Sequence, residues 1–108
     1  MEPSLLVRAL GETPELRVID YLLENDISDF SIQGIAEGAG LSRNTVSKIV
    51  CELEKIGVIV HTRDVGRAKL FKINIASQFV KHLRKLDLEI SKEYAHKVTA
   101  EQKVAVRA

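Results

Sequence analysis

Residues 35–50 read IAEGAGLSRNTVSKIV, an apolar helical pattern that breaks at glycine and is followed by a run of hydrogen-bonding side chains. Gly38 and Gly40 mark the break, because glycine readily adopts the left-handed conformation that ends many helices. Ser31 can cap the helix before the break, and Ser42 can cap the one after it. Apolar residues of the second helix recur three and four positions apart: Val46, Ile49, Val50, Leu53 and Ile56. The stretch therefore predicts two short helices joined by a tight turn, the second with polar donors at its N-terminus.

Two further capping signals lie upstream of this pair. Ser4 begins a short apolar stretch that Gly11 ends. Thr13 precedes Pro14, which suits the first position of a helix, and apolar residues then follow at helical spacing. We expect this helix to run from Pro14 to about Glu24.

After Gly57 the pattern changes from helix to strand. Residues 58–60 are β-branched, and residues 69–75 alternate between apolar and polar side chains. Between them, residues 64–67 read DVGR and supply a turn with glycine. The sequence predicts a β-hairpin with a basic tip over residues 58–75, and thus a fold class that is mainly α with a small β-hairpin (α+β).

A further helix is expected from Ala76. Its apolar residues form one stripe: Phe79, Leu83, Leu86 and Ile90. The stripe has two plausible uses, to fold back on the helix from Pro14 or to pack against the same helix of a second copy, and we favour the second. Thr99, with Gln102 three residues later, gives a weak capping signal, so the last segment is expected to be a short helix or a frayed tail.

Composition limits the chain to one modest core, since 108 residues at 45% hydrophobic content leave little material for a second. The net charge is only +1, but its distribution is uneven. Residues 1–40 carry two basic and eight acidic side chains, for a net charge of −6. Residues 41–72 carry +4 and residues 73–108 carry +3. The positive charge thus begins with the second helix of the pair.

Several classes of function are disfavoured. The single cysteine, Cys51, allows no intrachain disulfide, and His61, His82 and His96 include no close pair of strong metal ligands. No nucleophile motif or glycine-rich phosphate loop is present, so we expect no enzyme, no metal and no cofactor. No apolar run approaches the roughly 20 residues that span a bilayer, and the N-terminus lacks a basic leader. We expect a soluble, cytoplasmic protein without a membrane partner.

The paired helices resemble the helix-turn-helix signature, in which a second, recognition helix lies in the major groove of DNA. The match rests on the small, glycine and apolar positions of that signature: Ala36, Gly40, Leu41, Val46 and Ile49. The hairpin that follows makes residues 14–75 resemble a winged helix-turn-helix of the MarR/ArsR-like class of bacterial and archaeal transcription regulators. Residues 11–25, GETPELRVIDYLLEN, and 64–74, DVGRAKLFKIN, look particularly like small archaeal members.

This resemblance implies a winged helix-turn-helix domain over residues 1–75, with the helix-turn-helix at 31–56 and the wing at 58–75. Residues 76–108 would form a dimerisation arm and tail. The recognition-helix contacts to DNA would be Ser42, Arg43, Asn44, Thr45, Ser47 and Lys48. The wing contacts would be Arg63, Arg67 and Lys69, and the dimer interface Phe79, Leu83, Leu86 and Ile90. The expected function is sequence-specific binding of double-stranded DNA by a homodimeric transcription regulator.

Two other functions stay open at this point, because winged helices also serve as protein-interaction modules. One is a scaffold in a transcription or chromosome-maintenance complex, for which Leu5, Leu6 and Val7 are the candidate apolar surface. The other is binding to structured RNA through the same basic surface. Cys51 lies on the expected outward face of the recognition helix, where a redox-sensing role is a minor alternative to a small filler.

Overall fold

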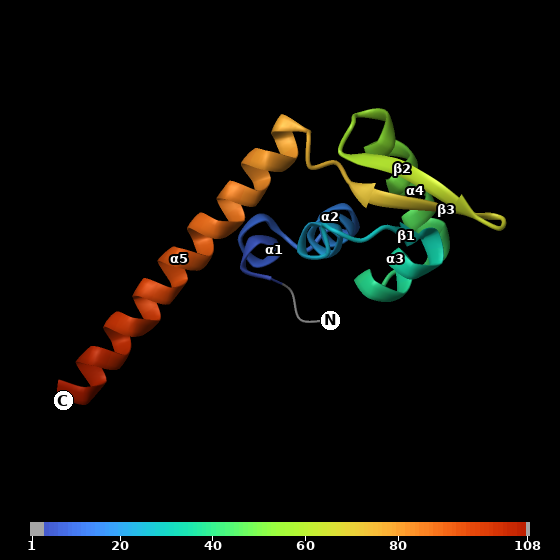
Figure 1. The fold of residues 1–108 in the computed structure, drawn as a ribbon. Helices are drawn as coiled ribbons and strands as arrows, with labels where there is room; N and C mark the ends of the chain where they lie inside the picture. The colour runs from blue at the N-terminus through green and yellow to red at the C-terminus, as the bar shows by residue number, and fades with distance from the viewer. Residues whose placement is uncertain (1–3, 108) are drawn as a thin grey trace.

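The computed structural model describes the backbone of residues 4–107 and the side chains of residues 4–100. The ends of the predicted domains at residues 1 and 108, and the Gln102 side chain, lie outside these limits. The elements follow in this order: α1 Leu5–Leu10, α2 Pro14–Glu24, β1 Phe30–Ser31, α3 Ile32–Ala39, α4 Arg43–Lys55, β2 Ile59–Val65, β3 Ala68–Ile73 and α5 Gln78–Arg107. The fold is mainly helical with a small antiparallel sheet (Figure 1).

All four capping residues predicted for the first four helices are confirmed. The side chains of Ser4, Thr13, Ser31 and Ser42 each accept a hydrogen bond from the backbone N–H three residues on, at 3.0 to 3.2 Å. Such a cap satisfies an amide that the helix itself cannot, and losing it costs about 1 kcal/mol. α2 has the bounds that the sequence predicts, Pro14–Glu24. Local chemistry therefore sets where these helices begin.

The two glycines of the helix-turn-helix do different things. Gly40 is the left-handed cap, with φ 68° and ψ 40°, and Leu41 N–H closes the turn on the Ala36 carbonyl at 2.9 Å. The prediction that Gly38 also ends the helix is wrong, because α3 continues through it to Ala39. Gly38 instead lies against the ring of Tyr21 in α2, where a side chain has no room.

A third strand joins the hairpin. The sheet order is β1-β3-β2, and the two residues of β1 pair with β3, Phe30 opposite Phe71 and Ser31 opposite Leu70. β1 was not predicted, because two residues are too few to show alternation and Ser31 carries the capping signal of α3. The hairpin itself is confirmed, with a two-residue turn at its tip in which Gly66 has φ 61°.

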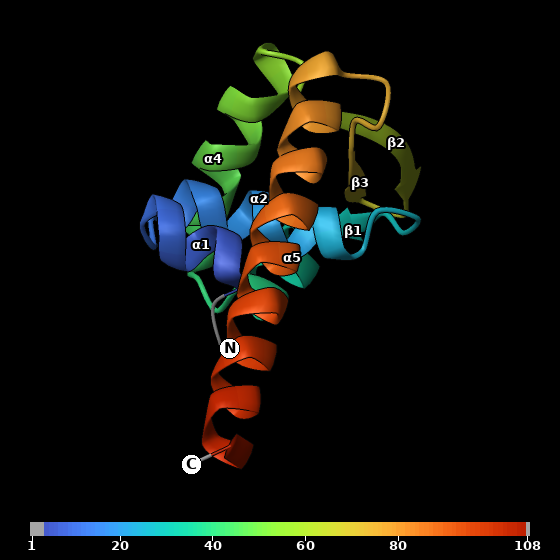
Figure 2. The same cartoon turned by 90° about the vertical axis from the view of Figure 1, so that its left-hand side faces the viewer.

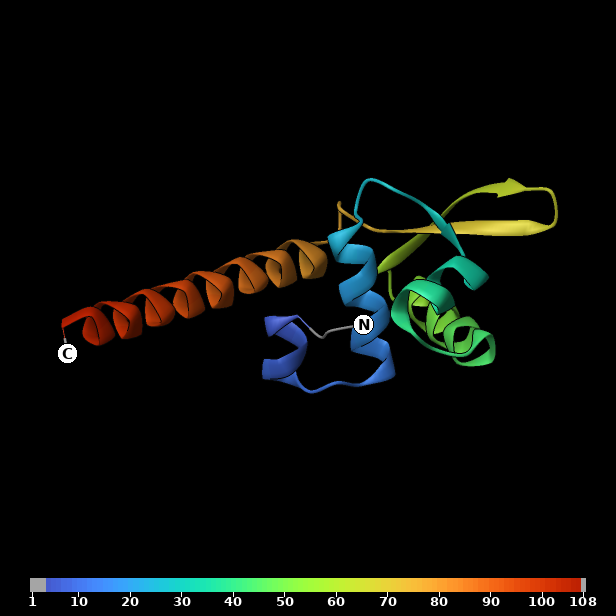
Figure 3. The same cartoon turned by 90° about the horizontal axis from the view of Figure 1, so that it is seen from below.

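One hydrophobic core joins the helices to the sheet. α2 runs through its centre, between α1 on one side and the α3–α4 pair on the other (Figure 3). Leu22 from α2, Ile35 from α3, Val46 from α4, and Ile59 and Ile73 from the two hairpin strands are all buried in it. Burying a side chain of this size stabilises the fold by about 1.5–3 kcal/mol. The recognition helix and the wing are thus fixed to a common base.

α5 is one continuous helix of 30 residues that leaves the domain and makes the molecule elongated, 61 × 27 × 21 Å. The prediction of a separate last segment is wrong: Thr99 lies inside the helix and its hydroxyl donates to the Ala95 carbonyl. α5 packs beside α1 (Figure 2). Its first turns bury Val80 and Leu83 and pair Arg84 with Asp26. In the described part of the chain, no helix has the length and hydrophobicity needed to cross a bilayer.

Candidate nucleic-acid interface

The outward face of α4 carries the predicted contact residues. Val46, Ile49 and Val50 are buried against the rest of the domain. The residues between them face solvent: Ser42, Arg43, Asn44, Ser47, Lys48 and Cys51 are exposed, and Thr45 is half-buried. Helical periodicity therefore separates a packing face from a polar face, as the sequence predicts.

The N-terminus of α4 is organised by its cap. Ser42 Oγ accepts from the Thr45 N–H at 3.2 Å and donates to Thr45 Oγ1 at 2.8 Å. The backbone N–H groups of the next two residues, Arg43 and Asn44, have no partner within the helix, as in any first turn. These amides and the positive end of the helix dipole favour an anion at this position.

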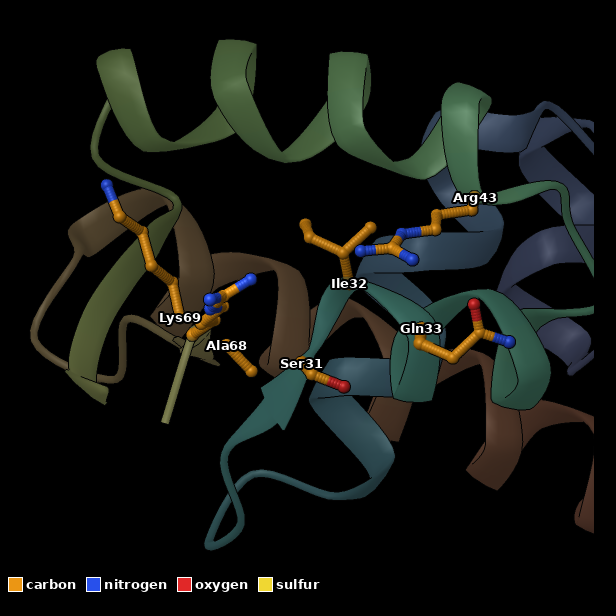
Figure 4. A pocket seen from close by; sticks show the side chains of 7 residues that line it. Ser31, Ile32, Gln33, Arg43, Ala68 and Lys69 are labelled. Carbon is orange, nitrogen blue, oxygen red and sulfur yellow. The ribbon is translucent and has the colours of Figure 1, made fainter. Parts of the chain in front are cut away.

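The wing tip and the recognition helix border a common hollow. Its volume is about 310 Å³, and its lining comes from the start of α3, the start of α4 and the end of the hairpin: Ser31, Ile32, Gln33, Arg43, Arg67, Ala68 and Lys69. Figure 4 shows Arg43 from α4, Gln33 from α3 and Lys69 from β3 around it. Segments that lie more than 20 residues apart in the sequence thus bring three cations to one place.

The charges around this hollow are available to a ligand. Among the described residues, Arg43, Arg67 and Lys69 form no ion pair with a carboxylate, and neither does Lys48 farther along α4. Acidic side chains on α4 lie toward its C-terminal end, where Glu52 pairs with Lys55 at 3.5 Å. The surface that suits a polyanion is therefore the N-terminal half of α4 together with the wing tip.

Arg63, the third predicted wing contact, is engaged elsewhere. Its Nε donates to Asp29 Oδ2 at 3.1 Å and its Nη2 donates to Asp29 Oδ1 at 3.4 Å. The hydrogen bond from Arg63 lowers the pKa of Asp29, with the Thr62 hydroxyl and the positive charge adding to the effect. Sequence reasoning missed Asp29, because it lies 34 residues from Arg63 and no local pattern links the two.

The predicted dimer stripe is divided by the fold. Phe79 and Leu86 are exposed and Ile90 is half-buried, whereas Leu83 is only 8% exposed and belongs to the core of its own chain. At the other terminus, Leu6 and Val7 are buried in α1. Leu5, the third residue of the apolar surface expected there for a protein partner, is half-buried, so most of that predicted surface lies in the core.

Among the described residues, no three histidine, cysteine, aspartate or glutamate side chains gather closely enough to hold a metal ion. His61 instead contacts Asp64 at 2.7 Å and packs edge-on against Phe71.

The sequence matches no protein-family model and no curated protein. Solved structures do match. MepR, described as a transcription regulator of the Staphylococcus aureus multidrug efflux pump MepA, superposes with a TM-score of 0.66 at 16% identity, over 94% of this chain and 76% of MepR. Ligand-free NadR gives a TM-score of 0.62 at 20% identity, over 95% of this chain and 74% of NadR.

A third match is a homodimeric winged helix-turn-helix DNA-binding domain from Mycobacterium bovis, described as part of a possible ArsR-family transcriptional regulator. Its TM-score is 0.58 at 22% identity, over 86% of this chain and 81% of that domain. At identities this low, the structural matches establish the fold alone. The chain has the winged helix-turn-helix fold, and the structures it matches include MarR-family and ArsR-like transcription regulators.

Proposed function

We propose that this protein is a transcription regulator that binds double-stranded DNA sequence-specifically as a homodimer. The observation that carries the proposal is the convergence of Arg43, Arg67 and Lys69 on one hollow between the recognition helix and the wing. Cations that pair with no carboxylate of the described residues, placed on the recognition helix and the wing, suit the phosphates of a duplex.

Within this function the residues divide into two groups. The exposed donors of α4 enter the major groove and read base edges: Arg43 or Lys48 addresses guanine and Asn44 addresses adenine. Ser42, Thr45 and the first amides of α4 bind a phosphate, and Ser47 adds a further donor on the same face. Arg67 and Lys69 at the wing tip follow the backbone. Base contacts set the preferred sequence, while backbone contacts add affinity on every sequence.

The exposed apolar side chains of α5 support dimerisation. α5 projects from the domain with large apolar side chains in solvent, namely Phe79, Leu86 and Tyr94, with Ile90 half-exposed between them. Apolar residues grouped on one side of a projecting helix are typical of an interface. Two-fold pairing would place two recognition helices about 34 Å apart, one turn of DNA. The Mycobacterium bovis domain with this fold is described as homodimeric, which supports the same arrangement here.

We also propose a regulatory role, a cytoplasmic location and a kinship with small archaeal regulators. MepR, one of the matched structures, is described as a transcription regulator. The proposed location follows from this role, because a transcription regulator must reach the DNA in the cytoplasm. The scaffold alternative loses most of its candidate surface, because Leu6 and Val7 lie in the core and only Leu5 is partly exposed. Structured RNA remains a competitor for the basic surface.

The proposal is tested by fluorescence anisotropy of a labelled duplex across a salt series, with a structured RNA as competitor. The wild-type protein should lose affinity steeply as salt rises, because bound phosphates release counterions. Arg67→Ala should bind more weakly and reduce the salt slope by about one. Arg8→Ala removes an exposed arginine of α1 and serves as the matched control, which should behave as wild type. Weak, salt-insensitive binding in all three proteins, or displacement by RNA at equal concentration, would contradict the proposal.

A further inference from the structure

Asp29 links the loop before β1 to β2, the first strand of the wing. Its Oδ2 accepts from the Thr62 hydroxyl at 2.6 Å and from Arg63 Nε at 3.1 Å, while Oδ1 accepts from Arg63 Nη2 at 3.4 Å. The guanidinium edge thus faces both carboxylate oxygens, which is the strongest and most directional form of an arginine–carboxylate pair. Both partners come from adjacent positions of β2, so one carboxylate holds two consecutive wing residues.

The contact falls where the hairpin is irregular. The pairing of β2 with β3 shifts register between His61 and Arg63, so Thr62 has no paired residue in the ladder. A bulge of this kind bends a strand and increases its twist, and so changes the direction in which the strand continues. Besides its bond to Asp29, Thr62 Oγ1 lies 3.3 Å from the Leu70 carbonyl of β3. The carboxylate therefore acts at the point from which the tip, with Arg67 and Lys69, takes its direction.

Asp29 is also joined directly to the helix-turn-helix. The next two residues, Phe30 and Ser31, form β1 and pair with β3. Ser31 then caps α3 through the Gly34 amide at 3.0 Å. Three consecutive residues thus bind the wing, extend its sheet and start the first helix of the reading unit. A movement of the wing relative to α3 and α4 would therefore break the Asp29 contacts.

We propose that Asp29 is a positioning residue that fixes the direction of the wing through Thr62 and Arg63, and that Arg63 serves this contact instead of binding a DNA phosphate. The inference rests on the proposed DNA-binding function. Arg63 already faces a carboxylate, so a phosphate that took its place would exchange one anion for another and gain little. Arg67 and Lys69 have no such partner among the described residues and remain the phosphate contacts.

A double-mutant cycle on DNA affinity tests the inference. Asp29→Ala and Arg63→Ala should each weaken binding to all duplexes by on the order of threefold to tenfold, and the double variant should be no weaker than the worse single variant. Because neither residue contacts a phosphate, both should leave the salt slope at its wild-type value. Arg67→Ala, measured beside them, should lower that slope by about one.

Two results would overturn the inference. Tighter binding with a steeper salt slope in Asp29→Ala would mean that the carboxylate competes with DNA for Arg63 and acts as a brake. A reduced slope in Arg63→Ala, with losses that add to those of Asp29→Ala, would mean that Arg63 contacts a phosphate independently.

Amide hydrogen exchange on the free protein separates this inference from the function on which it rests. Asp29→Ala and Arg63→Ala should both speed exchange at the amides of residues 61–70, whereas Arg67→Ala should not. If the wild-type protein shows no salt-dependent binding to DNA, the proposed function fails, and the exchange rates still decide whether Asp29 holds the wing. Unchanged exchange in both variants would contradict the positioning role.

Discussion

Gly38 in α3 lies directly against the ring of Tyr21 in α2, so that a Cβ on Gly38 would come within 2.2 Å of Tyr21 Cζ. The ring is not free to move away without loss, because it also packs against Phe30, with ring centroids 5.2 Å apart. The spacing between α2 and α3 therefore depends on the absence of a side chain at this position. Since α4 packs against α3 and follows it after a tight turn, the same contact helps to position the recognition helix.

Gly38→Ala should destabilise the fold, even though alanine favours a helix interior over glycine by about 1 kcal/mol. Displacing the Tyr21 ring is expected to cost about 1–3 kcal/mol, typical of overpacking, and this should exceed the gain. Denaturant unfolding gives the comparison. Gly34→Ala is the matched control in the same helix, because its Cβ would meet Ser31 Oγ at 3.4 Å and Phe30 Cβ at 3.7 Å, which are ordinary contacts. Equal stabilisation by both substitutions would show that Tyr21 does not limit the spacing.

Stability should depend on pH through Asp20, which is 1% exposed and accepts from Ser4 Oγ at 2.8 Å. Burial raises the pKa of Asp20, against the hydrogen bond from Ser4 and with a contribution from the charge of Asp87. The folded state thus holds this proton more tightly than the unfolded state does. The resulting stabilisation is complete below the unfolded pKa of about 3.9 and is lost as pH rises through the folded value.

Asp20→Asn should therefore flatten the fall in stability that this carboxyl causes in the wild type as pH rises above its ordinary pKa. Asp29→Asn should act in the opposite pH direction. The pKa of Asp29 is lowered in the folded state, so its stabilisation is present above its ordinary pKa and lost in acid, and the substitution should flatten that loss. Unfolding free energies of the three proteins at several pH values check both statements. A wild-type pH profile in Asp20→Asn would mean that the buried carboxyl keeps its ordinary pKa.

Two substitutions at the same hollow should have different effects, one on sequence preference and the other on affinity for every sequence. Arg43→Ala should cost about 1–3 kcal/mol on a preferred sequence and relax the choice at one base position. Lys69→Ala should weaken all sequences about equally, because a phosphate contact carries no sequence information. Affinity selection from a randomised duplex library, followed by sequencing, measures both effects. An unchanged selected sequence in Arg43→Ala would remove this residue from base readout.

The arm should dimerise through one side only. Leu86→Glu is expected to give a monomer in sedimentation equilibrium, because it places a charge in the proposed interface. Leu88→Glu is the matched control: Leu88 is 55% exposed and Leu86 48% exposed, yet two positions apart on a helix they point in nearly opposite directions. The control should remain a dimer. Dissociation by both substitutions, or by neither, would contradict the assigned interface.

Much of this fold could be predicted because its signals are local. Each of the first four helices begins at a capping side chain that bonds three residues on, and Gly40 and Gly66 have the positive φ that their turns require. Such features need only neighbouring residues, so the sequence displays them directly. The exposed face of α4 follows in the same way from helical periodicity.

The features that escaped prediction are those that distant segments create together. β1 forms because β3 lies beside it. Asp29 is far from the wing in sequence and contacts it only in the folded structure. Gly38 has the sequence signature of a helix end, and only Tyr21 of another helix explains its presence inside α3. Leu83 shares the periodicity of the exposed stripe, yet it is buried in the core of its own chain, where α5 packs on the domain. Helical periodicity predicts which side chains share a face, but not which other segment packs against that face.

The most direct test of the central claim is to titrate the labelled protein with a short duplex and follow its amide resonances by NMR. Changes should concentrate at residues 42–48 of the recognition helix and 63–69 of the wing, with none along residues 91–100 of the arm. Changes centred on the arm, or on the acidic surface of residues 1–40, or no change at millimolar duplex, would contradict DNA binding by the recognition helix and wing.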